Sequence, residues 1–77
     1  MEIIYTRQAA KAISKISNPL KKNIKEAIER LPAGDVKKLR GYKSAYRLRV
    51  GDYRILFTLN VKIEITNILS RGSSYKR

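Results

Sequence analysis

The fold of this chain is decided by residues 46–57, which read YRLRVGDYRILF. Apolar residues alternate with arginines as far as Val50, and the alternation resumes at Tyr53. A period of two predicts a pair of half-buried strands. Gly51 and Asp52 stand between them, and a two-residue loop with Gly first is typical of a type II′ hairpin turn. These residues therefore predict an antiparallel hairpin in which Val50 pairs with Tyr53.

The register of this hairpin places three arginines on one face. Arg49 is expected directly opposite Arg54, with Arg47 two residues further along the same face. Like charges opposite one another destabilise a sheet, so an anion between the guanidinium groups is favoured. Phosphate fits best, because the planar fork of Arg grips two oxygens at once. As no acid is expected among the three, we predict a phosphate-binding face; long solvated side chains without a ligand are the alternative.

The segments before the hairpin predict a strand and two helices. Residues 2–5 read as a short strand, and a helical spacing follows twice. Thr6 is expected to cap the first helix, Asn18 to cap the second, and Pro19 to occupy the first helical position. The expected apolar stripes are Ala9, Ile13 and Ile16, then Leu20, Ile24, Ile28 and Leu31. Residues 32–35 end the second helix, so an antiparallel helical hairpin is expected.

A last strand is expected over about residues 61–69, with Val61, Ile63 and Ile65 on its apolar face. Pairing Phe57 with Ile63 keeps the apolar faces together and implies a three-residue loop around Asn60. The order is β-α-α-β-β-β, an α+β fold with an antiparallel sheet packed against an N-terminal helical hairpin. We expect one domain over residues 1–77.

The composition indicates a partner of opposite charge. The chain carries 18 Lys and Arg against six Asp and Glu, a formal charge of +12 in 77 residues. Such an excess points to nucleic acid or an acidic protein. The sequence has no Cys and no His, so we expect neither disulfides nor a metal site of the usual type, and no cofactor. No signal peptide or membrane-binding helix is expected, which favours the cytoplasm.

The C-terminal segment is expected to return to the arginine face. The last strand runs antiparallel to the second strand of the hairpin, so its end should lie beside Tyr53 and Arg54. Arg71 and Tyr75 would then emerge near the arginines, where Tyr75 could stack on a base or exchange a proton. A frayed terminus is the alternative, as for most chain ends.

Three stretches of the sequence resemble the RelE family of toxins. They are Lys38-Leu39-Arg40-Gly41, the hairpin stretch 46–57, and the ending Arg71-Gly72-Ser73-Ser74-Tyr75-Lys76. The resemblance covers essentially the whole chain. It implies the toxin of a type II toxin–antitoxin pair that enters the ribosomal A site and cuts messenger RNA, with the RNA 2′-hydroxyl as nucleophile. It also implies an antitoxin that wraps and neutralises the toxin.

The resemblance also implies the residues that would act in cleavage. Arg47 and Arg49 match the two basic strand positions of the family, Arg54 its phosphate-binding arginine, Arg71 a C-terminal basic position and Tyr75 its C-terminal tyrosine. Some members have lysines at the first two positions, and arginine is a poor base at neutral pH. Tyr75 is then the best candidate base, its pKa lowered by neighbouring cations, while Arg71 or Arg54 would stabilise charge or assist the leaving group.

Two other functions are compatible with the sequence. A ParE-like relative would share the fold but inhibit DNA gyrase without cutting RNA. A non-catalytic module would bind only nucleic acid or an antitoxin. The ending at residues 71–76 favours the nuclease, whereas the absence of lysine at the two strand positions and of histidine favours the module.

Overall fold

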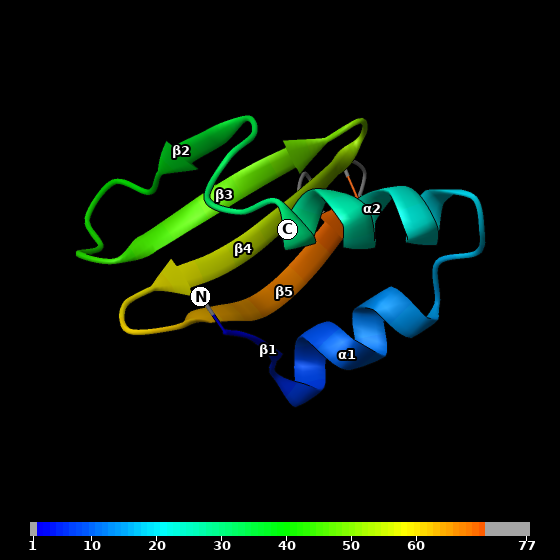
Figure 1. Cartoon of the computed structure of the whole chain (residues 1–77), viewed down its shortest axis with the longest axis horizontal. Coiled ribbons are helices and arrows are strands. Elements are labelled where there is room, and N and C mark those ends of the chain that lie inside the picture. Colours follow the sequence, from blue (N-terminus) through cyan, green and yellow to red (C-terminus); the bar gives the residue numbers. More distant parts are fainter. Residues whose placement is uncertain (1, 71–77) are drawn as a thin grey trace.

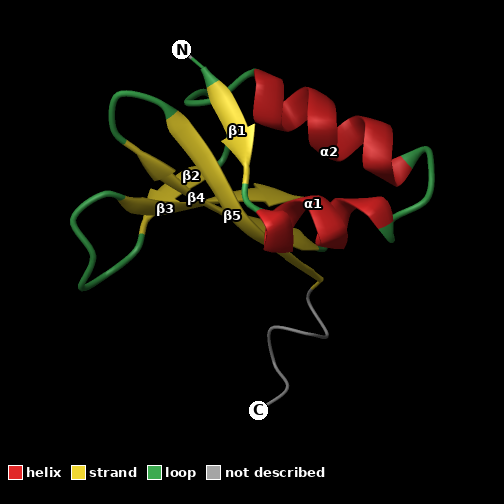
Figure 2. Ribbon diagram, turned by 90° about the horizontal axis from the view of Figure 1, so that it is seen from below, coloured by secondary structure: helices red, strands yellow, loops and turns green. Residues whose placement is uncertain are grey.

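The computed structural model of the chain describes residues 2–70 and contains two helices and a five-stranded sheet (Figure 1). The elements are β1 (Ile3–Tyr5), α1 (Arg7–Ser14), α2 (Leu20–Glu29), β2 (Val36–Lys38), β3 (Ala45–Val50), β4 (Tyr53–Leu59) and β5 (Ile63–Ser70). The strand order is β1-β5-β4-β3-β2, with β1 parallel to β5 and the other pairs antiparallel. Both helices lie on one face of the sheet (Figure 2), so the predicted α+β class is confirmed. The prediction of a wholly antiparallel sheet is wrong, because β1 is parallel to β5 and makes the sheet mixed.

The β3–β4 hairpin has the register that its sequence predicts. Val50 pairs with Tyr53, and Tyr46 pairs with Phe57 at the far end. Gly51 has a φ of +59°, while every non-glycine residue within 2–70 has a negative φ. A positive φ confined to the first of the two central residues is the pattern of a type II′ turn, which glycine adopts without steric cost. The hairpin therefore follows from local sequence.

The two helices begin in different ways. Thr6 caps α1 as predicted, because its Oγ1 accepts a hydrogen bond from the Ala9 N–H at 3.2 Å. The prediction that Asn18 caps α2 is wrong, since Pro19 occupies the cap position and makes no side-chain cap bond. The backbone of the preceding turn satisfies part of this helix end instead, with the Lys21 N–H donating to the Ser17 carbonyl at 3.1 Å.

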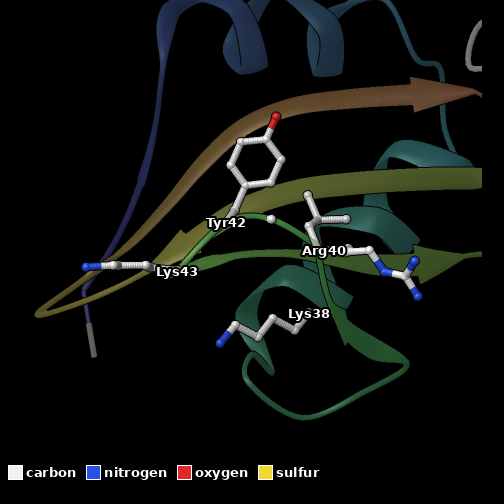
Figure 3. Close-up of a pocket in the computed structure, with 6 residues that line it drawn as sticks. Lys38, Arg40, Tyr42 and Lys43 are labelled. Carbon is white, nitrogen blue, oxygen red and sulfur yellow. The ribbon is translucent and has the colours of Figure 1, made fainter.

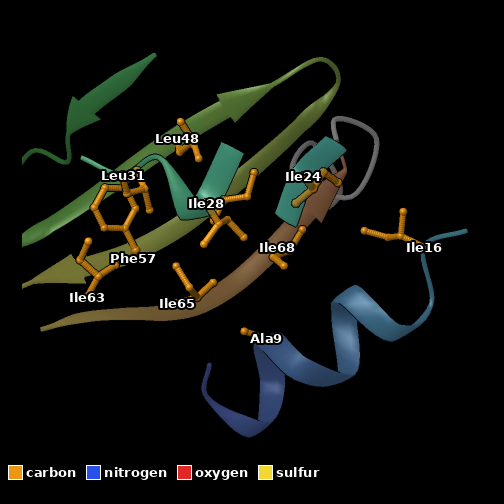
Figure 4. Packing of buried hydrophobic residues seen from close by; sticks show 11 residues of the cluster. Ala9, Ile16, Ile24, Ile28, Leu31, Leu48, Phe57, Ile63, Ile65 and Ile68 are labelled. Carbon is orange, nitrogen blue, oxygen red and sulfur yellow. The ribbon is translucent and has the colours of Figure 1, made fainter. Parts of the chain in front are cut away.

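The core lies between the helices and the sheet (Figure 4). Its buried side chains are Ala9, Ile16, Ile24, Ile28, Leu31, Leu48, Ile55, Phe57, Ile63, Ile65 and Ile68. The partly buried ring of Tyr46 packs against this core and stacks on Phe57, with the ring centroids 5.6 Å apart. Leu20, the first residue of α2, was expected on the apolar stripe of that helix, but it is 48% exposed and lies outside the core.

The pairing of β5 differs from the prediction. Phe57 lies opposite Ile65, not Ile63, and residues 60–62 form the turn. The two registers differ by two residues, which leaves every side chain on the same face, so the apolar pattern cannot distinguish them. The Asn60 N–H donates to the Lys62 carbonyl at 3.1 Å and closes the turn. Val61, expected inside the strand, is therefore 89% exposed.

A β-bulge at Thr66 changes the phase of β5. Leu56 pairs with Asn67 and Phe57 with Ile65, so Thr66 has no opposite residue. Its Oγ1 donates to the Leu56 carbonyl at 3.1 Å, which fixes the bulge. After the bulge Ile68 points into the core, and Leu69 pairs with Arg54 on the opposite face. The bulge thus sets which residues lie beside the arginines.

The structure adds one strand, β2, to the predicted order. It pairs with β3 at the edge of the sheet, with Val36 opposite Leu48. Three residues are too few to show an alternating pattern, which explains why the sequence does not reveal this strand. Within residues 2–70 neither helix has both the length and the apolar character that crossing a membrane requires.

Candidate functional site

The candidate site is the face of the sheet that the helices leave uncovered (Figure 2). Leu48 and Ile55 point into the core, and their neighbours Arg49 and Arg54 therefore point to the opposite face. Arg49 lies directly opposite Arg54, as the sequence predicts, and both are exposed. Arg47 lies on the same face, two residues further from the turn. The three predicted arginines are thus brought together.

Arg47 differs from the other two arginines. Its side chain is only 17% exposed, and its Nη1 donates to the Asp35 carbonyl at 3.3 Å. The same nitrogen lies 3.7 Å from Oδ1 of Asp35. The expectation that no acid lies among the arginines is therefore wrong. Asp35 directly precedes β2, the strand that the sequence does not reveal. Its contact with Arg47 depends on the pairing of β2 with β3, which is a feature of the tertiary structure.

Asp35 also fixes the backbone at this edge. Its carbonyl oxygen accepts a second hydrogen bond, from the Arg49 N–H at 3.0 Å. On β2, Lys37 lies opposite Arg47 and adds a further positive charge to the face. The sequence does not indicate Lys37 as a site residue, because β2 is too short to show an alternating pattern. The site therefore has an edge of paired charges around Asp35 and an open part formed by Arg49 and Arg54.

The open part presents unbalanced positive charge. Among residues 2–70, neither Arg49 nor Arg54 forms an ion pair within the chain. Two guanidinium groups side by side repel each other unless an anion lies between them. Each can donate two parallel hydrogen bonds to phosphate oxygens, so together they can bind a phosphodiester and stabilise extra charge on it.

Two predicted site residues, Arg71 and Tyr75, lie outside the described residues. The last residue of β5, Ser70, pairs with Tyr53, next to Arg54 in the sequence. The expected return of this strand to the hairpin is thus confirmed as far as residue 70.

The described part of the chain offers no cluster suited to metal binding, and the tyrosine whose pKa is shifted lies away from the arginines. His, Cys, Asp and Glu side chains within residues 2–70 do not gather in groups of three that could hold a metal ion. Burial raises the pKa of Tyr5, and the charge of Glu29 raises it further. Tyr5 pairs with Ile65, on the core side of the sheet, so its phenol is not part of the site.

Comparison with known proteins identifies the family. Residues 3–75 match the family described as "ParE toxin of type II toxin-antitoxin system, parDE". Toxin RelE3 of Methanocaldococcus jannaschii is 31% identical over 84 aligned residues, which cover 97% of this chain and 96% of the relative. The chain belongs to the RelE/ParE toxin family. The resemblance drawn from the sequence is thereby confirmed.

This RelE/ParE family member is also similar to toxins in solved complexes. The RelB–RelE antitoxin–toxin complex of Methanococcus jannaschii matches with a TM-score of 0.82 at 30% identity, covering 94% of both chains. The RelE–RelB complex of Pyrococcus horikoshii OT3 matches with a TM-score of 0.73 at 26% identity, covering 92% of this chain and 94% of that one. The RelBE2 complex of Mycobacterium tuberculosis, at 20% identity and a TM-score of 0.77, shares the fold.

Proposed function

We propose that this toxin is a ribosome-dependent endoribonuclease that cuts messenger RNA in the A site and so stops translation. The observation that carries the proposal is the exposed cross-strand pair of Arg49 and Arg54 on the helix-free face. A phosphodiester bound between the two guanidinium groups would have its developing negative charge stabilised as it reacts. The cytoplasm, where ribosomes and messages are found, is the implied location.

The reaction that suits such a site is attack of the RNA 2′-oxygen on the adjacent phosphorus. A bond forms from the 2′-oxygen to phosphorus, and the bond from phosphorus to the 5′-oxygen breaks. The products are a 2′,3′-cyclic phosphate and a free 5′-hydroxyl. One proton leaves the 2′-hydroxyl and one reaches the 5′-oxygen, so an acid and a base are needed.

The proposed roles divide between the sheet and the C-terminal segment. Arg49 and Arg54 bind the phosphate and stabilise the pentavalent transition state, and Arg47 adds its charge from beside them. Tyr75 takes the 2′-hydroxyl proton, and Arg71 or Arg54 assists departure of the 5′-oxygen. Arg71 and Tyr75 are assigned from the family ending alone. Tyr75 is the preferred base because the sequence has no His and arginine holds its proton at neutral pH.

A cognate antitoxin is the proposed protein partner. The similar toxins of M. jannaschii and P. horikoshii were solved in complexes with RelB antitoxins. A chain with a formal charge of +12 favours a partner segment rich in Asp and Glu. Such a segment would cover apolar surface, neutralise the arginine face and keep RNA away from it.

A ParE-like inhibitor of DNA gyrase is the second candidate. The family description that matches residues 3–75 names ParE, which favours it. The arginine face alone would also suit a protein that binds nucleic acid without cutting it.

One experiment separates these functions. Purified protein is added to a cell-free translation reaction, and message ends are mapped by primer extension. Cleavage at codon positions that requires ribosomes supports the nuclease, and its loss in Arg54→Ala and Tyr75→Phe supports the assigned roles. Arrest of translation with intact message would overturn the cleavage proposal. Inhibited supercoiling in a gyrase assay would identify the second candidate.

A further inference from the structure

A second basic surface lies at the other end of β3 from the arginine pair. Residues 38–43, the β2–β3 loop with the last residue of β2, form an open hollow that we call the loop surface (Figure 3). β3 begins at Ala45 beside this loop and reaches Arg49 four residues later, about 13 Å away along an extended strand. The loop surface is therefore separate from the arginine pair.

The backbone of the loop is held in place at three points. The Leu39 N–H donates to the Ala45 carbonyl at 2.9 Å, and the Tyr42 N–H donates to the Leu39 carbonyl at 3.4 Å. Gly41 has a φ of +85°, as the third residue of a type II turn requires. On the sheet side, the Leu59 N–H donates to the Ser44 carbonyl at 3.0 Å and ties the loop to β4. Local hydrogen bonds thus fix the shape of the loop.

The turn at Gly41 directs the next side chain into solvent. Tyr42 is 64% exposed, which is unusual for a ring that packing could bury. In Figure 3 its ring stands out from the loop, with Arg40 and Lys43 extending to either side and Lys38 on the other side of the chain. A Cβ at Gly41 would meet no atom within 4 Å, so the space beside the backbone just before Tyr42 is also open.

The charge around Tyr42 is entirely positive. Residues 36–44 contain four Lys and Arg and no Asp or Glu, and the neighbouring turn at residues 60–62 adds Lys62 and no acid. An exposed ring flanked by cations matches single-stranded nucleic acid, in which a base stacks on the ring and phosphates contact the cations. An acidic peptide would need the cations but not the ring. A lipid surface would need more apolar area than Tyr42 and Val61 provide.

We propose that the loop surface binds unpaired nucleotides of RNA, with a base stacked on Tyr42 and the flanking phosphates on Lys38, Arg40 and Lys43. This inference deepens the proposed function by adding a binding surface away from the reacting phosphate, and it rests on that function for the choice of RNA. The loop surface takes no part in bond breaking. It holds RNA while the arginine pair acts on a different phosphate.

The test uses an RNA that cannot be cleaved. A short 2′-O-methyl oligonucleotide containing 4-thiouridine is cross-linked to the full-length protein by light, and the protein is digested with trypsin. Residues 41–43, 44–47 and 50–54 fall in three different tryptic peptides, so Tyr42, Tyr46 and Tyr53 are distinguished. We expect the cross-link in peptide 41–43. A cross-link found only in the other peptides would overturn the proposal.

Binding of the same oligonucleotide is measured by fluorescence anisotropy. Tyr42→Ala is expected to weaken binding about tenfold, and Tyr42→Phe to bind like the wild type because the ring is kept. The logarithm of the binding constant falls as the logarithm of the salt concentration rises. Replacing Lys38, Arg40 and Lys43 together by Ala should make this slope less steep by about 2, because one phosphate contact contributes about 0.7. Lys22→Ala, an exposed lysine on α2, is the matched control and should leave the slope nearly unchanged. Equal affinity of Tyr42→Ala and the wild type would overturn the proposal.

Two further outcomes distinguish this inference from the proposed function. If message stays intact in translation reactions but peptide 41–43 still cross-links, the nuclease proposal fails and the loop surface stands. Chemical modification of the Tyr42 phenol is also compared with antitoxin and with RNA bound. If the cognate antitoxin protects Tyr42, while RNA neither protects it nor cross-links to peptide 41–43, the loop is a protein contact and this inference fails.

Discussion

Arg49 and Arg54 face each other across β3 and β4, two like charges in direct register on the face that the helices leave open. In the residues described, neither is neutralised by a carboxylate. A sheet that keeps two cations in this position loses stability unless an anion joins them. In the proposed function this pair binds a phosphate at the expense of stability, and both effects can be measured.

The first prediction concerns cleavage. Arg54→Ala should lower the rate of message cleavage by about 10²–10³-fold, the usual effect of removing one group that stabilises a transition-state charge. Arg54→Lys keeps the charge without the fork and should lie in between. Primer extension over a time course gives the rates, with Lys22→Ala as the exposed control. An unchanged rate in Arg54→Ala would remove the arginine pair from the mechanism.

The arginine pair that favours cleavage should lower the stability of the fold. Replacing Arg49 by Gln removes one of two opposed charges, so the free energy of unfolding should rise by a few tenths of a kcal/mol, up to about 1 kcal/mol. Urea unfolding at low salt measures the change. The gain should shrink as salt screens the repulsion. Loss of stability in this variant would show that Arg49 makes a stabilising contact within the chain.

Asp35 and Arg47 should contribute unequally to stability. The carboxylate of Asp35 is 62% exposed and lies 3.7 Å from the guanidinium, so Asp35→Asn should cost less than about 1 kcal/mol. Arg47→Ala also loses the hydrogen bond to the Asp35 carbonyl and the packing of a mostly buried stem, and should cost about 1–2 kcal/mol. Urea unfolding of both variants tests the order. A larger loss in Asp35→Asn would mean that the ion pair dominates.

Gly51 is needed in the hairpin turn for its backbone conformation and not for lack of space. A Cβ there would meet no atom within 4 Å, yet the φ of +59° is unfavourable for any residue with a side chain. Gly51→Ala should therefore cost about 1–2 kcal/mol. In a domain of this size that lowers Tm by roughly 4–8 °C for each kcal/mol. Asp52→Ala, the neighbouring turn residue, is the control and should change Tm much less.

Truncation of Phe57 and of Tyr42 should have very different effects on stability. Phe57 is 1% exposed and stacks on Tyr46, so Phe57→Ala should cost about 3–5 kcal/mol and leave the isolated toxin largely unfolded. Tyr42 is 64% exposed, and Tyr42→Ala should change stability by less than about 0.5 kcal/mol. Circular dichroism with thermal unfolding compares them. A destabilised Tyr42→Ala would mean that this ring supports the loop.

The buried phenol of Tyr5 should make stability fall at high pH. Burial, aided by Glu29, raises its pKa above the ordinary value of 10.0, so the native state keeps a proton that the unfolded state loses. The stability that this raised pKa confers is fully present below the pKa of Tyr5 in the unfolded chain, and it is lost as the pH rises through the pKa in the folded protein. Tyr5→Phe cannot ionise, so its stability relative to wild type should increase above about pH 10. Urea midpoints between about pH 8 and 11 measure this, and a constant difference would contradict it.

Short-range sequence pattern was sufficient for the hairpin and for most of the core. Alternation on both sides of Gly51 set which residues of β3 and β4 are buried, and the turn set their register. The helical spacing placed Ile24 and Ile28 in the core for the same reason. These features depend on residues close in sequence, where side-chain period and backbone preference act directly.

The features that depend on pairing between distant segments could not be predicted from local sequence. The register of β5 is two residues from the predicted one, and the bulge at Thr66 that brings Leu69 beside Arg54 has no signature in the sequence. The three-residue strand β2 pairs with β3 at the edge of the sheet, and this pairing brings Asp35 to Arg47.

Local sequence is thus enough to place Arg47, Arg49 and Arg54 on one face, because alternation and a two-residue turn leave no other register. The structure alone decided that Arg47 is held by Asp35 while Arg49 and Arg54 stay open, because that contact joins residues 12 apart through an edge strand. It also decided that Tyr42 stands in solvent, because hydrogen bonds from Leu39 and to Ser44 shape the loop beneath it.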